Sequence, residues 1–171
     1  EKIPFYFSID FEDQTYDVGR AVGKSNPEIR EKALELSYER AQLFSKKFFG
    51  GKKMTFFTTG ILARNCPQLI RKIYEDGHEI GCHYNFHDNI NQSNREDFAR
   101  NLDIAIDSIE NITGEKPLGF RAPSFAIDRH NTWAYEELAK RFDYDSSYKT
   151  SSPIAGKLNA KKFQFKENNL Y

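Results

Sequence analysis

Short apolar runs alternate with longer amphipathic stretches along most of the chain. The first run, Ile3 to Ile9, is rich in β-branched and aromatic residues, and it ends abruptly in the acidic sequence Asp10-Phe11-Glu12-Asp13. This pattern is typical of a buried strand that ends at a functional edge. Comparable runs predict further strands at Met54–Thr59, His78–His83 and Leu118–Arg121, and one leading into Asp145.

The stretches between these runs have the spacing of helices. Asn26-Pro27 supplies an N-cap and a first-turn proline for a helix start, and Gly50-Gly51 is a stop signal. Between them, apolar residues recur at helical spacing and are expected to face the core: Ile29, Ala33, Leu36, Leu43 and Phe44. The same reasoning predicts helices at Pro67–Asp76, about Asn94–Ile112 and Thr132–Lys140.

Strands that alternate with helices in this way indicate βαβ units, and therefore a mostly parallel sheet with helices outside it. In such α/β folds the active site lies at the carboxyl ends of the strands. Polar clusters follow four of the predicted strands, at Asp10–Asp13, His83–His87, Arg121–Ser124 and Asp145–Ser147. The sequence therefore predicts a functional site where these four strand ends meet.

The alternation stops after Ser147. Residues Lys161 to Lys166 alternate in polarity and indicate a hairpin or an edge strand, and no further helix or parallel strand is predicted after them. Four or five βα units are too few to close a barrel, which needs about eight strands. We therefore expect one domain over residues 1–171, with its fold truncated at the C-terminal end.

Composition narrows the possible partners. The 171 residues carry 25 Lys and Arg against 25 Asp and Glu, so no net field favours nucleic acid or anionic lipid, and we expect a neutral partner. No stretch reaches the roughly 20 apolar residues of a membrane span, and the first residues lack the pattern of a signal peptide. Cys66 and Cys82 are too few for a disulfide framework. These features predict a chain that does not span the membrane and lies in the cytoplasm.

His83 and His87 are candidate metal ligands. Two histidines four residues apart lie on one face of a helical turn, where both rings can reach a single ion. A pair of surface or capping histidines explains the spacing about as well. A third ligand from the acidic cluster, Asp10, Glu12 or Asp13, would complete a common set of two histidines and a carboxylate.

The acidic cluster itself has two interpretations. Carboxylates that follow a strand often only cap the next element. However, acids buried close together repel one another unless a cation or an arginine neutralises them. One can then bind a metal while another acts as general base, and Arg121 can orient that base through a bidentate contact. Arg121 can equally be a surface cation beside Pro123.

Other reactive side chains are expected to be structural. His78 precedes a strand and fits a buried histidine bonded to the backbone, and His130 fits an exposed residue before a helix. Cys82 alternates with the strand residues around it and fits a small core residue better than a nucleophile. No phosphate loop or nucleophile elbow occurs in the sequence.

Five motifs, taken in order, resemble those of the NodB-type polysaccharide deacetylases, also called carbohydrate esterase family four. They are the segments Ser8–Asp13, Thr55–Gly60, Asp76–His87, Thr113–Phe125 and Tyr144–Ser147. The resemblance implies a distorted (β/α) barrel with fewer strands than a regular one. It also implies a divalent ion, often zinc, and hydrolysis of N-acetyl groups on a glycan.

The resemblance also implies roles for single residues. Asp10 corresponds to the catalytic base, Arg121 to the residue that orients it, and His83 and His87 to metal ligands. Residues expected to contact substrate are Tyr84, Pro123, Ser124, Phe125 and Asp145. Tyr84, Phe86 and Phe125 are candidates for stacking on the sugar ring, and each fits a packing residue equally well.

Two departures from the family pattern matter. Most members place a second aspartate directly after the first, where this chain has Phe11. The third ligand is then Asp13, our preference, or Glu12, as in a subgroup with an Asp-x-Glu-Asp motif. That subgroup includes enzymes of surface-polysaccharide assembly and relatives that act on cyclic amides.

The second departure concerns the general acid. The family's late histidine, which protonates the leaving amine, is missing because no histidine follows His130. Either the chain is a fragment or another group acts as the acid, and we expect a fragment because the barrel is also too short to close. Two alternatives remain open: an amidohydrolase of the same fold that acts on a small cyclic amide, and a domain that only binds glycan.

Overall fold

The computed structural model of the chain describes residues 6–148, 163–165 and 168–170. Its strands, in chain order, are β1 (Ser8–Phe11), β2 (Thr55–Thr58), β3 (Glu79–Cys82), β4 (Gly119–Phe120), β5 (Tyr144–Asp145), β6 (Phe163–Phe165) and β7 (Asn168–Leu170). Its helices are α1 (Gln14–Ala21), α2 (Glu31–Phe49), α3 (Gly60–Asn65), α4 (Pro67–Glu75), α5 (Arg95–Thr113) and α6 (Trp133–Ala139). Two short 3₁₀ turns complete them, η1 (Ile90–Gln92) and η2 (Pro123–Phe125).

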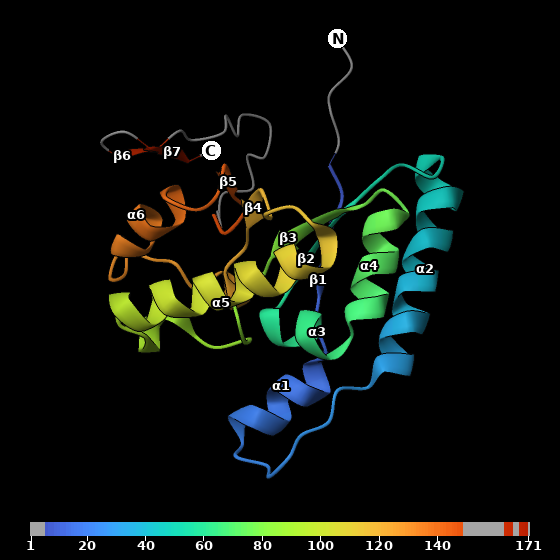
Figure 1. Cartoon of the computed structure of the whole chain (residues 1–171), viewed down its shortest axis with the longest axis horizontal. Helices are drawn as coiled ribbons and strands as arrows, with labels where there is room; N and C mark the ends of the chain where they lie inside the picture. Colours follow the sequence, from blue (N-terminus) through green and yellow to red (C-terminus); the bar gives the residue numbers. More distant parts are fainter. Residues whose placement is uncertain (1–5, 149–162, 166–167, 171) are drawn as a thin grey trace.

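The first five strands form one parallel sheet in sequence order, β1-β2-β3-β4-β5. Each crossover between neighbouring strands contains at least one helix, and Figure 1 shows α3, α4 and α5 on one side of the sheet. The predicted βαβ arrangement is therefore confirmed. The predicted hairpin is also present, since β6 and β7 pair antiparallel, and β7 lies against α6.

The sheet is curled. Arg121 follows β4 and Asp10 lies in β1, so two strands separate them. Neighbouring strands lie about 4.8 Å apart, and a flat sheet would hold β1 and β4 roughly 14 Å apart. Nevertheless, Nη1 of Arg121 lies 2.6 Å from Oδ1 of Asp10, and its Nη2 lies 2.8 Å from Oγ of Ser8. The sheet thus bends around this face, as part of a (β/α) barrel does, and the predicted fold class is confirmed.

Two glycines make room for aromatic rings on the concave face. A Cβ at Gly119 would lie 1.9 Å from Cζ of Tyr144, and one at Gly81 would lie 2.5 Å from Cδ1 of Phe57. The rings of Phe57 and Tyr144 therefore lie over the positions that side chains of β3 and β4 would otherwise fill. Phe57 in turn supports the guanidinium of Arg121, whose Cζ lies 4.2 Å from the ring centroid.

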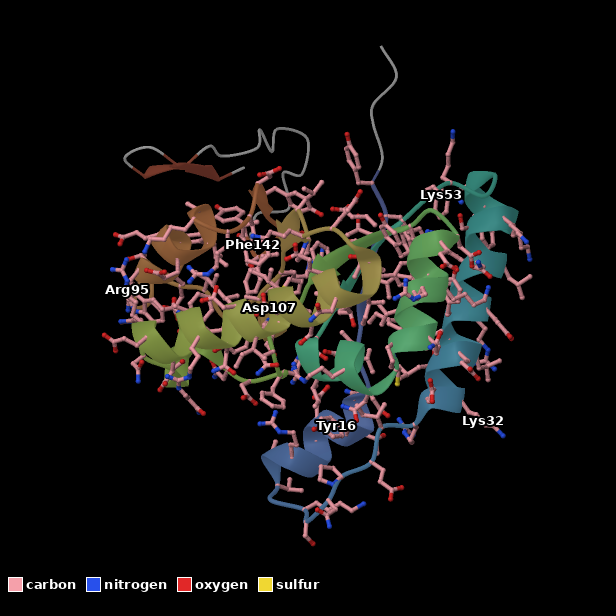
Figure 2. All side chains as sticks on the ribbon, viewed as in Figure 1. Tyr16, Lys32, Lys53, Arg95, Asp107 and Phe142 are labelled. Carbon is pink, nitrogen blue, oxygen red and sulfur yellow. The ribbon has the colours of Figure 1, made fainter. Side chains whose placement is uncertain are left out.

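The other face of the sheet forms the main core under the helices. Phe56 of β2 packs edge-to-face with Phe11 of β1 and with Tyr38 of α2, with ring centroids 5.6 Å apart in both pairs. Phe120 of β4 packs against Phe142, which lies among the side chains near α6 (Figure 2). Aromatic rings thus pack between the sheet and the helical layer that covers it.

The predicted inner face of α2 is wrong. Leu36, Leu43 and Phe44 are exposed, Leu43 by 65%, whereas Leu34 and Tyr38 are buried. Apolar residues occur on two faces of this helix, and the contact of Tyr38 with Phe56 selects the one that faces the sheet. The helix also begins at Glu31, after an Arg30 N-cap, and not at Asn26-Pro27.

Two helices were not predicted. The side chain of Asp13 caps α1 by accepting from the backbone N–H groups of Thr15 and Tyr16. Helix α3 has only six residues and starts directly after β2, with Thr59 as its N-cap. In neither helix do apolar residues recur at helical spacing over several turns, which is the pattern from which the other helices were predicted. Strand β1 begins at Ser8, and the predicted start at Ile3 lies outside the described residues.

Candidate active site

Three strand ends bring the predicted catalytic residues to one edge of the sheet. Glu12 follows β1, His83 follows β3 and Arg121 follows β4. These strands are parallel, so their carboxyl ends lie at the same edge, where the polar clusters were expected to meet. Asp10, in β1, belongs to the same group through its contact with Arg121.

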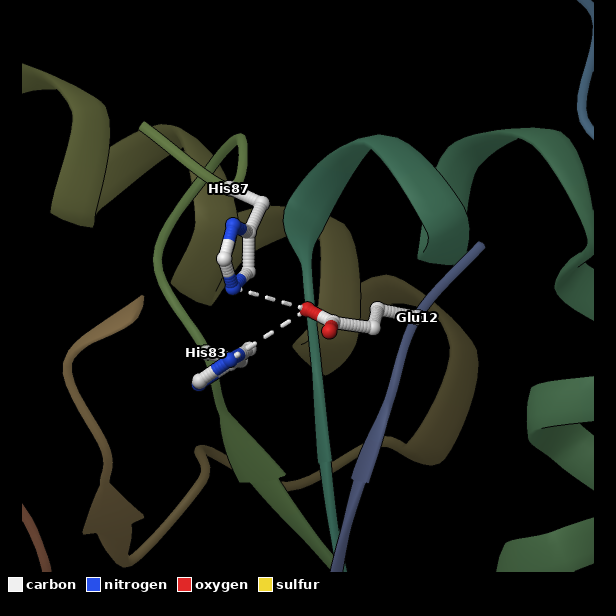
Figure 3. Close-up of side chains that lie close together, drawn as sticks. All are labelled: Glu12, His83 and His87. Atoms are coloured by element: carbon white, nitrogen blue, oxygen red, sulfur yellow. Dashed lines mark ion pairs between the residues drawn. The ribbon is translucent and has the colours of Figure 1, made fainter. Parts of the chain in front are cut away.

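Glu12, His83 and His87 converge on one point (Figure 3). Oε2 of Glu12 lies 3.1 Å from Nε2 of His87 and 3.5 Å from Nε2 of His83. The ligand atoms of the three residues all lie within 4.8 Å of one another. The predicted convergence of both histidines with an acid from the end of the first strand is therefore present in the structure.

The hydrogen bonds of His83 identify the role of each ring nitrogen. Its Nδ1 lies 2.8 Å from the carbonyl oxygen of Arg121, and because a carbonyl only accepts, Nδ1 carries the proton. In the neutral ring, Nε2 then presents a lone pair to the carboxylate of Glu12. Among the described residues, neither Nε2 of His83 nor Oε2 of Glu12 has a hydrogen-bond partner, although both atoms are buried.

This arrangement fits a divalent cation. A ring lone pair and a carboxylate oxygen that face each other without a proton repel, and leaving both buried without a partner is costly. A cation shared with Nε2 of His87 satisfies all three atoms. Two histidines and a carboxylate are a common ligand set that leaves positions open for water and substrate, and a backbone bond that orients a ligating histidine is the usual support for it.

The two histidines reach this point by a loop and not by a helical turn. The residues from His83 to His87 lie outside any helix, and Tyr84 adopts a left-handed φ of 68°. The start of α3 holds the loop, because the N–H groups of Gly60 and Ile61 donate to the carbonyls of Tyr84 and Asn85, both at 2.9 Å. The helical geometry that the spacing suggested is therefore corrected, while the shared target of the two rings is retained.

Asp13, our preferred third ligand, lies elsewhere. Its buried carboxylate caps α1 and accepts from the backbone N–H of Arg30 at 2.7 Å and from its guanidinium at 3.0 Å. Burial on its own raises the pKa of Asp13, but the hydrogen bonds from Arg30, Tyr16 and Thr15 outweigh burial and hold its pKa below the usual value. The structure thus brings Glu12, and not Asp13, to the histidines.

Asp10 and Arg121 form the pair that the sequence predicted. Besides its 2.6 Å contact with Asp10, the guanidinium donates to Oγ of Ser8 at 2.8 Å and to Oγ of Ser146 at 2.7 Å. These bonds come from β1 and from the residue after β5, so both edges of the curled sheet fix the arginine. The alternative interpretation, a surface cation, does not fit a side chain that is only 13% exposed.

Comparison with known proteins agrees with this arrangement. A family model described as polysaccharide deacetylase matches residues 50–142, more than half of the chain. The chain belongs to the polysaccharide deacetylase family. The matched region contains His83, His87 and Arg121, whereas Asp10 and Glu12 precede it.

Curated relatives have names that belong to the same family. Peptidoglycan deacetylase-like protein FGM2 of Gibberella zeae is 35% identical over 96 residues, which are 56% of this chain and 28% of that protein. Peptidoglycan-N-acetylmuramic acid deacetylase PdaA of Bacillus subtilis is 26% identical over 108 residues, 63% of this chain and 40% of that protein. The chain thus spans less than half the length of these relatives.

Solved structures share the fold. A structure described as a polysaccharide deacetylase of Mycobacterium smegmatis superposes with a TM-score of 0.73 at 24% identity, over 96% of this chain and 56% of that one. PuuE allantoinase superposes with a TM-score of 0.57 at 19% identity, over 82% of this chain and 52% of that one. At these identities the likeness concerns the fold alone.

The residues that family resemblance assigned to substrate contact divide into two groups. Ser124 and Phe125 are exposed and both adopt a left-handed φ of 54°, and the ring of Phe125 lies 5.6 Å from Cζ of Arg121. They border the pair of Asp10 and Arg121. Pro123 and Tyr84 are buried, and Tyr84 stacks on Phe98 in the core, so substrate contact by the Tyr84 ring is not what this structure shows.

Asp145 is also placed differently from the expectation. It pairs in register with Phe120 on the helix side of the sheet, away from Asp10. Its carboxylate accepts from the hydroxyl of Ser147 at 2.5 Å, and that hydroxyl accepts from the backbone N–H of Ala122 at 2.7 Å. Asp145 therefore supports the backbone that follows Arg121, and its burial raises its pKa to about 6.

The remaining histidines and cysteines are structural, as predicted. His78 is buried and accepts from the backbone N–H of Met54 at 3.1 Å, whereas His130 is exposed. Burial raises the pKa of Cys82 to about 12 and that of Cys66 to about 11, so neither thiol is a nucleophile near neutral pH.

Two side chains of α1 near the ligands, Arg20 and Asp17, match no pattern in the sequence. Arg20 of α1 contacts Phe86 and Asp88, which flank His87. Asp17, on the same helix, has its pKa raised to about 6, mainly by burial, with smaller effects from the charges of His87 and Glu12. Helix α1 was not predicted, so nothing in the sequence pattern directed these side chains to the site.

No helix among the described residues is both long enough and apolar enough to cross a bilayer. The predicted cytoplasmic location stays a prediction.

Proposed function

We propose that residues 1–171 form a single domain of a divalent-metal-dependent deacetylase. Its proposed reaction is the removal of N-acetyl groups from an amino sugar in a glycan. The observation that carries the proposal is the group of Glu12, His83 and His87, in which two buried atoms have no hydrogen-bond partner among the described residues, together with the pair of Asp10 and Arg121. Zinc is the ion that such a ligand set most commonly binds.

The metal ligands would be Nε2 of His83, Nε2 of His87 and Oε2 of Glu12. A divalent ion held there supplies Lewis-acid chemistry for the acetyl carbonyl and lowers the pKa of water. The backbone bond from Nδ1 of His83 to Arg121 keeps the accepting nitrogen of that ring directed toward the site. This bond also couples the position of the ligand to the position of the arginine.

Asp10 is the proposed general base. Arg121 holds Oδ1 of Asp10, so Oδ2 is the oxygen that takes a proton from the attacking water. After attack, the amide carbon–nitrogen bond breaks, acetate leaves, and the sugar nitrogen takes up a proton. In this proposal the proton that Oδ2 of Asp10 took from water is the one that passes to the sugar nitrogen, so the proton count balances.

The proposed substrate is an N-acetylated glycan. Relatives are named as deacetylases of peptidoglycan N-acetylmuramic acid and N-acetylglucosamine, which are amino sugars of this kind. The exposed ring of Phe125, next to Arg121, offers an apolar surface on which a sugar face can pack. The Asp-x-Glu-Asp subgroup and its surface-polysaccharide substrates stay predictions.

Acetate release from N-acetylglucosamine oligomers tests the proposal. We expect activity that a chelator abolishes and added zinc restores, and an Asp10→Asn variant that keeps zinc but loses about 10²- to 10⁴-fold in kcat. Zinc binding and glycan binding without acetate release would instead indicate a non-catalytic domain. Hydrolysis of allantoin, with none of the oligomers, would indicate the amidohydrolase alternative.

A further inference from the structure

Helix α1 follows the segment that carries Glu12 and contacts the loop that carries His83 and His87. It begins directly after Glu12, with Asp13 as its N-cap, and its eight residues extend about 12 Å to Ala21. Figure 1 shows it beyond the end of β1, near α3. Its two ends are held by two different sets of contacts.

The N-terminal end is fixed by Asp13. This carboxylate accepts from Thr15 and Tyr16 inside the helix, and from the backbone and side chain of Arg30 at the start of α2. The segment from Asp13 to Arg30 is therefore closed into a loop by one buried carboxylate. Glu12 directly precedes this anchor, so its backbone position is set by it.

The C-terminal end is fixed by Arg20. Its Nη1 donates to Oδ1 of Asp88 at 3.0 Å, its Nη2 donates to Oδ2 at 3.4 Å, and its Cζ lies 4.0 Å from the ring centroid of Phe86. Phe86 and Asp88 are the residues on either side of His87. One guanidinium thus contacts both chain neighbours of His87. Its N–H groups bond to the carboxylate of Asp88, and its flat face lies over the ring of Phe86.

His87 needs this support more than His83 does. The backbone carbonyl of Arg121 orients the ring of His83. For His87, no hydrogen bond to Nδ1 is present within residues 6–148, and its ring contacts are with Glu12 and His83 themselves. The orientation of His87 therefore depends on the backbone around it, which Arg20 holds.

We infer that Arg20 is a positioning residue that fixes the place of His87 relative to Glu12. Helix α1 then holds the segment that carries Glu12 and the loop that carries His87 in one fixed arrangement. The inference rests on the proposed metal centre. It goes beyond that proposal because Arg20 touches neither the metal ligands nor the reacting atoms. The contact with Asp88 is partly exposed, 30% for the Arg20 side chain and 50% for that of Asp88. Its expected effect is therefore on ligand geometry more than on overall stability.

Equilibrium affinity for Zn²⁺, measured by competition with a chromophoric chelator, tests the inference without reference to activity. We expect Arg20→Ala and Asp88→Ala each to weaken zinc binding about 10-fold, the lower end of what outer-shell changes cause. The double variant should weaken it little further, because both changes remove the same contact. Arg20→Lys keeps the positive charge but loses the paired N–H groups that bond to Asp88. Its zinc affinity should lie between that of Arg20→Ala and that of the unchanged protein.

Arg100→Ala is the matched control, since Arg100 forms an exposed ion pair with Asp97 within α5 and bonds to none of the three proposed ligands or their chain neighbours. Unchanged zinc affinity in Arg20→Ala, or an equal loss in Arg100→Ala, would overturn the inference. Asp88→Asn decides the matter if the Arg20→Ala protein does not fold. Failure of the unchanged protein to bind zinc would instead refute the metal centre itself, which separates the two claims.

Discussion

At the scale of single residues, two adjacent carboxylates have separate roles. Glu12 faces two histidines with a buried oxygen that accepts no hydrogen bond from the described residues, whereas Asp13 accepts hydrogen bonds from α1 and from Arg30. Both are acids after a strand, and nothing in their spacing distinguishes a ligand from a cap. The difference arises from Arg30, which lies 17 residues away and was not part of any motif.

Substitutions of these two acids should therefore have opposite effects. Glu12→Gln should abolish zinc binding while leaving the free energy of unfolding of the metal-free protein unchanged or higher, because it removes a repulsive contact. Asp13→Ala should lower that free energy by about 1–3 kcal/mol through the lost cap and the lost partners of Arg30. Denaturant unfolding and zinc titration of both variants check this. Zinc binding that Glu12→Gln retains would contradict it.

Asp145 gives a prediction for pH. Burial raises its pKa from the usual value of 3.8 to about 6 in the folded chain, so between these values the folded state binds the proton more tightly than the unfolded state does. Its contribution to stability is complete below about pH 4 and is lost as the pH rises through about 6.

The Asp145→Asn variant isolates this contribution. Relative to the unchanged protein, it should gain stability as the pH rises from 4 to 7, and unfolding free energies measured across that range provide the check. A difference between the two proteins that stays constant with pH would show that Asp145 titrates normally.

At the scale of elements, the alternation of strands and longer helices along the chain could be predicted, but helix faces and short helices could not. Periodicity located α5 to within a residue because Asn94 caps it and its apolar period is long. The same method chose the wrong face of α2, since only the sheet decides between Leu34 with Tyr38 and Leu36 with Leu43. Spacing alone predicts a helical turn from His83 to His87, because it carries no information on a left-handed Tyr84.

The close approach of the Tyr144 ring to Gly119 gives a prediction at this scale. Gly119→Ala would place a Cβ within 1.9 Å of the Tyr144 ring, so the ring or strand β4 must move. We expect a loss of about 1–3 kcal/mol in the free energy of unfolding, the usual cost of overpacking. Adding Tyr144→Leu should recover part of this loss, because the smaller side chain vacates the position. A fully additive double variant would show that the ring is not the obstacle.

At the scale of the whole molecule, the curl of one parallel sheet creates the site. It brings Arg121 of the fourth strand to Asp10 of the first, and places Glu12 beside the histidines that follow the third. The family resemblance predicted the first contact and an acid beside the two histidines, but it favoured Asp13 over Glu12 for that acid. It could not predict α1 with its Arg20 contact, because 68 residues separate Arg20 from Asp88 and neither belongs to a motif. Long-range contacts of this kind are set by tertiary packing, which periodicity does not encode.

Anomalous diffraction at the zinc edge, from crystals of the zinc-loaded protein, tests the central claim most directly. The account predicts one strong peak about 2.0–2.2 Å from Nε2 of His83, Nε2 of His87 and an oxygen of Glu12. A zinc ion bound by Asp13 in place of Glu12, or no ordered ion between the two histidines, would contradict it.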